Sequence, residues 1–253
     1  MSDVVVSVIM PAYNCEKYIG KAIESVLHQD VPLELIVVND NSTDGTGRII
    51  EDYMKDSRVR MLNNTENMGA ARSRNIAINS SVGRYIAFLD ADDYWTDDKL
   101  KKQISFMQRH NSILSSTARE LMREDGTLSG KVIGVPERIT YKRLLQGNVI
   151  NTSGVVIDAE IARKYPMGQE RLHEDYIMWL SILRDYGEAH GLNEPLLKYR
   201  VMGGTKSSNK LKSAKMTYGV YRYMGYGILR SFYYFCWYAI RGIAKYLGFW
   251  QKR

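Results

Sequence analysis

The chain has 253 residues, of which 45% are hydrophobic and 25% charged, and its formal net charge is +7. A chain of this length can bury a sizeable core and hold one large domain with an appendage. Its two cysteines, Cys15 and Cys236, lie far apart and give neither a disulfide framework nor a metal-ligand spacing, which favours a reducing compartment.

Positive charge is concentrated toward the C-terminal end. Residues 195–253 contain twelve Lys or Arg and no Asp or Glu, whereas residues 1–194 contain 23 basic and 28 acidic residues. A mildly acidic body therefore carries a basic, aromatic tail. This asymmetry predicts an anionic partner for the tail.

Strand and helix patterns alternate through the first hundred residues. Residues 1–10 lack the basic start of a signal peptide and are interpreted as a first strand. Apolar runs predict strands, and apolar residues at helical spacing predict the helices between them. The expected strands are 4–10, 35–38, 59–62 and 85–89, and the expected helices are 19–27, about 46–55, and a third that contains 72–75. This order predicts an α/β fold with an open, mostly parallel sheet flanked by helices.

The strand at 85–89 ends in three carboxylates, Asp90, Asp92 and Asp93. Carboxylates held together at a strand end repel one another, and a divalent cation or a nearby Arg or Lys offsets this repulsion. The Asp-x-Asp pattern suits Mg²⁺ or Mn²⁺, which share their coordination shell with substrate phosphates. The alternative is an acidic turn that caps a helix beginning near Thr96.

Polar loops follow the other strands as well. Ligands of open α/β sheets bind at the carboxyl ends of the strands, so we expect Tyr13, Asp40 and Asp92 to lie along one rim. Taken singly, Tyr13 is typical of a packing residue and Asp40 of a loop cap, and Arg74 is typical of a helix surface. Their joint order and spacing favour a shared functional site.

Four blocks in this half resemble the family 2 glycosyltransferases with the GT-A fold. They are Val-Ile-Met-Pro-Ala-Tyr-Asn at 8–14, Val-Val-Asn-Asp-Asn-Ser-Thr-Asp-Gly-Thr at 37–46, Asn-Met-Gly-Ala-Ala-Arg-Ser-Arg-Asn at 67–75 and Phe-Leu-Asp-Ala-Asp-Asp at 88–93. Any one block alone is a weak signal, whereas the four together at this spacing are highly specific.

The resemblance implies a nucleotide-sugar donor, expected to be a UDP-sugar, and a Mn²⁺ or Mg²⁺ ion. Tyr13 would stack on the uracil, Asp40 would accept a hydrogen bond from the base, and Arg74 would lie near the phosphates. Asp92, and after it Asp90, would bind the metal. The remaining donor-binding residues implied by the motifs are Pro11, Ala12, Asn14 and Ala91. Asn39 departs from the pattern, because the family usually carries an Asp there.

The second half, residues 104–208, is expected to bind the acceptor. Its pattern predicts strands at 113–120 and 151–157, a hairpin turn at 124–127, and helices at 140–146 and 159–164. Apolar residues at 176, 177, 179, 180 and 183 predict an amphipathic helix, and Glu174 and Asp175 at its start suit the helix dipole.

The resemblance assigns that acidic pair a further role, because the family carries its catalytic base at this place. Asp175 would be the base, and Glu174 would orient the acceptor or Asp175. His173 is a competing base on pKa grounds. A single base on the face opposite the leaving group implies one in-line displacement with inversion at the anomeric carbon.

Residues 199–206 resemble a flexible segment of the family. Arg200 and Lys206 would close over the diphosphate there. Met202 stands where the family often carries a His, and it cannot bind a metal or phosphate in that way.

The tail at 209–253 is rich in Tyr, Phe and Trp. The sequence predicts helices at about 213–224 and 229–250, with a hinge at 225–227. On a helical wheel Arg230, Arg241, Lys245 and Lys252 share one side and most aromatic residues lie off it, which favours an amphipathic helix on an anionic membrane. The alternative is packing on the domain or in a homo-oligomer. Nucleic acid is not favoured, because no binding module accompanies the tail.

We therefore predict a glycosyltransferase domain at 1–208, with a nucleotide-binding half at 1–103, and membrane-associating helices at 209–253. The expected reaction transfers sugar to a lipid-linked glycan for a bacterial surface polysaccharide, at the cytoplasmic face of the inner membrane. A nucleotidyltransferase with an acidic metal site and a non-catalytic membrane scaffold remain open alternatives. A processive synthase is not favoured, since the chain has no transmembrane bundle and no Gln-x-x-Arg-Trp motif.

Overall fold

The computed structural model describes residues 4–168, 171–202 and 210–246, with residues 210 and 242–246 as helix backbone only. Its strands are β1 Val6–Ala12, β2 Leu33–Asn39, β3 Val59–Asn63, β4 Tyr85–Phe88, β5 Tyr94–Trp95, β6 Leu114–Met122, β7 Leu128–Ile133, β8 Arg138–Thr140, β9 Val155–Asp158 and β10 Glu188–Arg200. Its helices are α1 Ile19–Leu27, α2 Thr46–Tyr53, α3 Ala70–Ser80, α4 Lys99–Arg109, α5 Tyr141–Leu145, the 3-10 turn η1 Thr152–Gly154, α6 Ala159–Lys164, α7 Glu174–Tyr186, α8 Lys210–Tyr223 and α9 Ile228–Tyr246.

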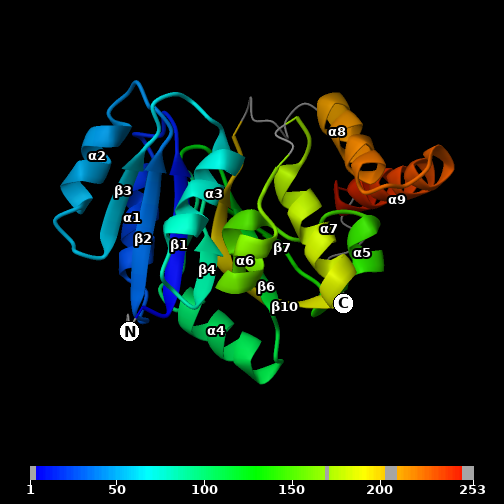
Figure 1. Ribbon diagram of the computed structural model, residues 1–253, viewed down its shortest axis with the longest axis horizontal. Helices are drawn as coiled ribbons and strands as arrows, with labels where there is room; N and C mark the ends of the chain where they lie inside the picture. The colour runs from blue at the N-terminus through cyan, green and yellow to red at the C-terminus, as the bar shows by residue number, and fades with distance from the viewer. Residues whose placement is uncertain (1–3, 169–170, 203–209, 247–253) are drawn as a thin grey trace.

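One mixed sheet runs through the molecule in the order β3-β2-β1-β4-β9-β6-β10-β5 (Figure 1). The strands β3, β2, β1 and β4 are parallel to one another, and β9 joins them to β6 through antiparallel pairs on both of its sides. Because β10 pairs with β6 in parallel, the prediction of a mostly parallel α/β sheet is confirmed. The carboxyl ends of β1, β2 and β4 therefore share one rim.

Helices cover both faces of this sheet. Strand residues alternate between the faces: Ile9 packs with α3, α6 and α7, whereas Val8 and Met10 pack with α1 and α4. Since both faces are covered, β1 and β4 are almost wholly apolar, as their sequences indicate.

Helix α7 is more buried than its sequence suggests. The predicted amphipathic helix exists, but eight of its thirteen residues are buried, including Trp179 and Leu180, because α8 and α5 pack around it beside the sheet. The residues predicted as its apolar face are all buried, and exposure is confined mainly to its last three residues, Arg184 to Tyr186.

Two other predictions in the second half also need correction. The expected strand at 151–157 begins only at Val155, because η1 occupies the residues before it. Tyr199 and Arg200, expected in a flexible segment, end the thirteen-residue strand β10. This strand was not predicted, since Pro195 and several polar residues interrupt its pattern and its pairing with β6 shifts register between Leu192 and Leu197. Lys206 lies outside the described residues.

The tail packs on the domain. Helices α8 and α9 contact each other at the end of the molecule opposite α2 and β3 (Figure 1), and Gly225, with φ of 89°, turns the chain between them. Val220 and Tyr221 are fully buried in the core beside α7. The helical-wheel prediction of an outward basic stripe is wrong for Arg241, which is half-buried and donates to Gln146 Oε1 at 2.7 Å.

Candidate active site

Side-chain hydrogen bonds tie the loop after β1 to the loop after β2. Asn14 Oδ1 accepts from the Thr43 amide at 2.8 Å, and the Cys15 amide donates to Thr46 Oγ1 at 2.8 Å. Asn14 itself has φ of 46°, a conformation that Asn tolerates better than most residues. Tyr13, directly before these two anchoring residues, remains 49% exposed, so its ring is available for stacking.

Asp40, at the end of β2, is 3% exposed and organises the start of α3. Its Oδ1 accepts from Asn64 Nδ2 at 2.6 Å and from the Met68 amide at 2.8 Å, and its Oδ2 accepts from the Gly69 amide at 2.8 Å. The carboxylate therefore orders the loop that delivers Arg74. Its expected hydrogen bond to a base stays a prediction, and that bond would share oxygens already in use.

Arg74 reaches from α3 to the end of β4. Its side chain is 7% exposed, and Nη2 donates to Asp90 Oδ1 at 2.5 Å. Burial alone would lower the pKa of Arg74, but the negative charges of Asp90, Asp175 and Glu174 outweigh burial and raise it. The Arg74 guanidinium thus interacts electrostatically with both predicted acidic clusters: the aspartates after β4, and Glu174 with Asp175 at the start of α7.

Asp92 carries a poorly compensated negative charge. Burial and the charge of Asp90 raise the pKa of Asp92 to about 6, against the lowering effects of Arg200 and Arg74. Asp93 is deeper still: its Oδ1 accepts from the Arg200 amide at 2.8 Å, and burial raises its pKa well above the ordinary value. Since Arg74 already holds Asp90, a cation is most needed at Asp92.

The donor set fits a metal that also binds substrate. Among the described residues, no group of three or more His, Cys, Asp or Glu side chains could hold a metal by itself. Mg²⁺ and Mn²⁺ do not require such a group, because they bind through one or two carboxylates together with waters and substrate phosphates. The carboxylate oxygens of Asp92, together with the Asp90 oxygen that Arg74 does not contact, match this pattern.

Helix α7 brings the second acidic group to the same place. Asp175 Oδ2 accepts from Thr152 Oγ1 at 2.8 Å, and Oδ1 accepts from the Tyr176 amide at 2.7 Å. The next residue of η1, Ser153, accepts with Oγ from the Asp90 amide at 3.2 Å. Consecutive residues of η1 therefore link Asp175 to the end of β4.

The remaining predicted positions lie around this centre. Ala12 and Ala91 are buried, and Pro11 is half-buried near the end of β1. Glu174 is 8% exposed at the first position of α7. His173 lies 3.3 Å, through Nε2, from both the carbonyl oxygen and the hydroxyl of Ser213 on α8, so it contacts the tail.

Arg200 serves the site differently from the expectation drawn from the sequence. Its Nε donates to the Asp92 carbonyl at 2.8 Å, its Nη1 donates to the Glu124 carbonyl at 2.7 Å, and its guanidinium lies 4.4 Å from the Tyr18 ring centre. Arg200 therefore links the turn that contains Asp92 to the β6–β7 turn. Contact with a diphosphate stays a prediction.

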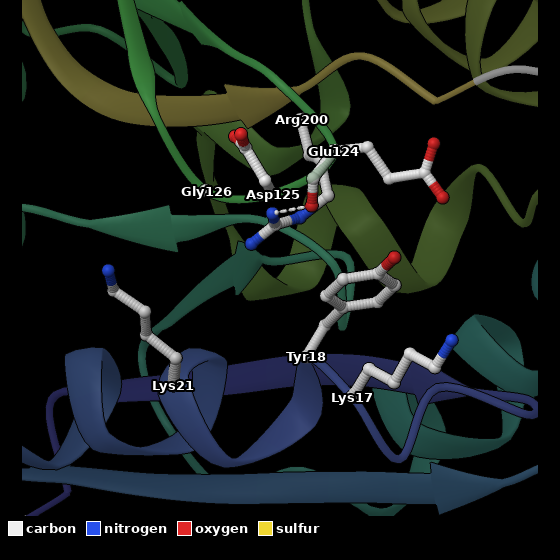
Figure 2. A pocket seen from close by; sticks show the side chains of 7 residues that line it. All are labelled: Lys17, Tyr18, Lys21, Glu124, Asp125, Gly126 and Arg200. Carbon is white, nitrogen blue, oxygen red and sulfur yellow. Dashed lines mark hydrogen bonds between the residues drawn. The ribbon is translucent and has the colours of Figure 1, made fainter.

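A pocket of about 600 Å³ opens beside this arginine (Figure 2). Figure 2 shows Tyr18 below the Arg200 guanidinium, with the α1 side on one edge and the β6–β7 turn on the other. The lining residues are Lys17, Tyr18, Lys21, Glu124, Asp125, Gly126 and Arg200. The pocket is therefore adjacent to the backbone of Asp92.

Sequence reasoning missed Thr152, Ser153 and Arg119. The first two act through side-chain hydrogen bonds to residues far away in the sequence, and no sequence spacing predicts such contacts. Arg119 on β6 lies 5.5 Å from the Tyr199 ring centre, and burial lowers its pKa although the charges of Tyr199 and Asp93 raise it. The residues around Arg119 in β6 include Ser116, Thr117 and Glu120, so no local pattern singles it out.

Known proteins resemble this chain over most of its length. Residues 7–163 match the family model described as Glycosyl transferase family 2. The chain is 44% identical over 219 residues to the putative teichuronic acid biosynthesis glycosyltransferase TuaG of Bacillus subtilis, covering 86% of this chain and 87% of that protein. It is 37% identical over 250 residues to the UDP-Glc:alpha-D-GlcNAc-diphosphoundecaprenol beta-1,3-glucosyltransferase WfgD of Escherichia coli, covering 97% and 96%.

Solved structures share the fold at lower identity. S. aureus TarS in complex with UDP-GlcNAc superposes with a TM-score of 0.71 at 21% identity, covering 86% of this chain and 65% of that one. The mannosyltransferase PcManGT of Pyrobaculum calidifontis, in complex with GDP-Man and Mn²⁺, gives a TM-score of 0.69 at 18% identity, covering 93% and 70%. The chain spans slightly under two thirds of the TarS structure. At these identities the likeness concerns the fold, and it confirms the expected GT-A-like architecture.

Proposed function

The chain belongs to glycosyl transferase family 2, and we propose that it moves a sugar from a UDP-sugar to a hydroxyl group of a lipid-linked glycan. Its relatives in bacterial cell-surface polysaccharide biosynthesis, two of which are named as acting on GlcNAc-diphosphoundecaprenol, support this acceptor class. The observation that carries the proposal is the position of Arg74, which pairs with Asp90 and also lies in the field of Asp175 and Glu174.

In this proposal the two acidic groups divide the chemistry. Asp92, assisted by Asp90, would hold Mn²⁺ or Mg²⁺, which when bound supplies positive charge to the departing diphosphate. Asp175 accepts the proton of the acceptor hydroxyl as that oxygen attacks the anomeric carbon. Its hydrogen bonds from Thr152 and from the Tyr176 amide fix the orientation of the carboxylate.

The roles of the other residues follow from their places. Tyr13 offers an exposed ring for the base, and Asp40 holds the loop that positions Arg74. With Asp175 as the one assigned base and no nucleophile assigned for a two-step route, the proposed reaction is a single displacement that inverts the anomeric configuration. We propose that residues 1–103 bind the donor, 104–208 the acceptor and 209–253 the membrane surface.

This assignment predicts a defined substrate dependence. The full chain, given a UDP-sugar, Mn²⁺ and an undecaprenyl-diphosphate-linked GlcNAc acceptor, should form product, and EDTA should abolish product formation. Product is followed by chromatography across UDP-, GDP- and dTDP-sugars, and NMR of the product reports the anomeric configuration. Turnover that persists in EDTA would contradict the metal, and turnover with GDP-sugars alone would contradict the UDP donor.

We propose that the tail docks on the cytoplasmic face of the membrane without crossing it. No helix in the described part of the chain is sufficiently long and apolar to span a bilayer. Helix α9 nevertheless exposes an apolar stripe at helical spacing, and Leu211 of α8 adds to it with 85% exposure. The exposed fractions along α9 are Leu229 86%, Phe232 60%, Tyr233 54% and Ile240 57%. An apolar stripe beside Lys and Arg is typical of helices that lie in an anionic headgroup layer.

Replacing part of this stripe should release the protein from vesicles. The double variant Leu229→Ser/Phe232→Ser is expected to lose about tenfold or more in binding to vesicles that contain phosphatidylglycerol, because it removes two exposed apolar contacts. Flotation measures the bound fraction. Val82→Ser is the matched control, since Val82 is 54% exposed on the body of the protein. Equal flotation of both variants and the wild type would contradict the docking proposal.

A further inference from the structure

Two arginines from distant parts of the sequence meet where α5 and α9 touch. Arg143 belongs to α5, and Arg241 of α9 donates through Nη2 to Oε1 of Gln146, which follows α5 directly, at 2.7 Å. Both arginines are half-buried. The fold thus brings two partly desolvated positive charges near each other.

The positive charge of Arg143 is not balanced by a carboxylate in the described part of the chain. Among the described residues Arg143 forms no ion pair, and its Nη1 is buried without a hydrogen-bond acceptor. Burial and the positive charge of Arg241 lower the pKa of Arg143 to about 10. Like charges in a partly desolvated place are unfavourable unless an anion joins them, and a guanidinium nitrogen without an acceptor adds to that cost.

The pair lies close to the proposed acceptor site. The Tyr176 hydroxyl donates to the Leu144 carbonyl at 2.6 Å, and Tyr176 directly follows Asp175 in α7. Tyr176 also influences the titration of Arg143, which places its ring near the guanidinium. Through Tyr176, α5 is therefore joined to α7 one residue beyond the proposed base. On the other side, α9 leads from Arg241 to the exposed apolar stripe.

We propose that Arg143 and Arg241 together form a binding site for the diphosphate of the lipid-linked acceptor. The inference rests on the proposed function, and it adds the residues that recognise the non-sugar part of that acceptor. Two planar guanidinium groups present paired N–H donors that match phosphate oxygens. A diphosphate held there would leave its sugar toward Asp175 and its lipid chain along α9.

The test compares lipids that differ only in the diphosphate. Nanodiscs of neutral phosphatidylcholine contain either undecaprenyl diphosphate or undecaprenol, and binding of the full chain is measured by titration. We expect the wild type to bind the diphosphate lipid more tightly, and Arg143→Gln and Arg241→Gln each to lose about tenfold of that preference, the usual size of a charge-assisted contact. Arg230→Gln is the matched control, because it removes the same charge from an exposed position on α9.

A third nanodisc separates an acceptor site from general headgroup binding. On phosphatidylglycerol discs without undecaprenyl lipid, Arg143→Gln should bind like the wild type, whereas a loss there equal to the loss on diphosphate discs would overturn the proposal. An unchanged diphosphate preference in both Arg143→Gln and Arg241→Gln would also overturn it. Retained UDP binding shows that each variant is folded. If arginine-dependent binding persists but no sugar is transferred, the diphosphate site stands and the transferase proposal fails.

Discussion

Replacing Asp92 by asparagine is expected to abolish sugar transfer while making the metal-free protein more stable. The carboxylate is the proposed ligand of the divalent ion, whose Lewis-acid contribution is worth several kcal/mol, so the rate should fall by about 10³-fold. Measurement of product formation at saturating Mn²⁺ and donor checks this loss. An activity within a few-fold of the wild type would contradict the proposed role of Asp92.

The gain in stability follows from the raised pKa of Asp92. Its ordinary value is 3.8, and in the fold it is raised to about 6 by burial and by Asp90. At about pH 3 and below, the group is mostly protonated in both states. Between pH 4 and 6 the unfolded chain releases the proton first, so the free energy of unfolding falls by roughly 2–3 kcal/mol and stays lower above that range.

Asparagine carries no such charge, so the variant should gain stability only above that pH range. In EDTA at pH 7.5 the denaturant midpoint of Asp92→Asn should exceed that of the wild type, and at pH 4 this difference should be much smaller. Asp97→Asn, an exposed position five residues further along, should change neither midpoint nor activity. A lower midpoint for Asp92→Asn at pH 7.5 would show that the carboxylate is compensated within the protein.

Replacing Asp175 by asparagine should remove catalysis without removing donor binding. General-base catalysis contributes about 10²- to 10⁴-fold, and the amide cannot accept the proton. Because Asp175 lies at the start of α7 and its side-chain hydrogen bonds in the described part of the chain go to η1 and to the Tyr176 amide and not to the proposed metal ligands, the affinity for UDP and Mn²⁺ should remain within about twofold of the wild type. Calorimetry measures that affinity, and product formation measures the rate.

Asp185→Asn provides the control on the same helix. Asp185 lies near the other end of α7, where it accepts from the Tyr165 hydroxyl at 2.6 Å. Its substitution by asparagine should leave the rate of sugar transfer unchanged. Full activity in Asp175→Asn would shift the role of base to another group, with His173 the first to test. If Asp92→Asn and Asp175→Asn were both fully active, a non-catalytic scaffold would be the better account.

The first half of the molecule could be predicted because its signals are local. The run before Asp90 is apolar on both sides since β4 is covered by helices on both faces. The carboxyl ends of parallel strands then meet by topology, so Tyr13 and Asp92 could be assigned to one rim before any coordinates were known.

The rest depends on contacts between distant segments. Strand β10 contains Pro195 and a register shift, and it exists because β6 and β8 pair with it. Thr152 and Ser153 join the two acidic groups through hydrogen bonds that span 23 and 63 residues. Arg241 donates to Gln146 across 95 residues of sequence, a contact that a helical wheel of one isolated helix does not reveal.

The direct measurement of the central claim is a crystal structure of the protein with a UDP-sugar and Mn²⁺, read by anomalous scattering at the manganese edge. The account predicts a manganese peak within bonding distance of the Asp92 carboxylate, the diphosphate on that ion, and Asp175 on the opposite side of the sugar. A peak remote from Asp92, or Asp175 on the same side as the diphosphate, would contradict it.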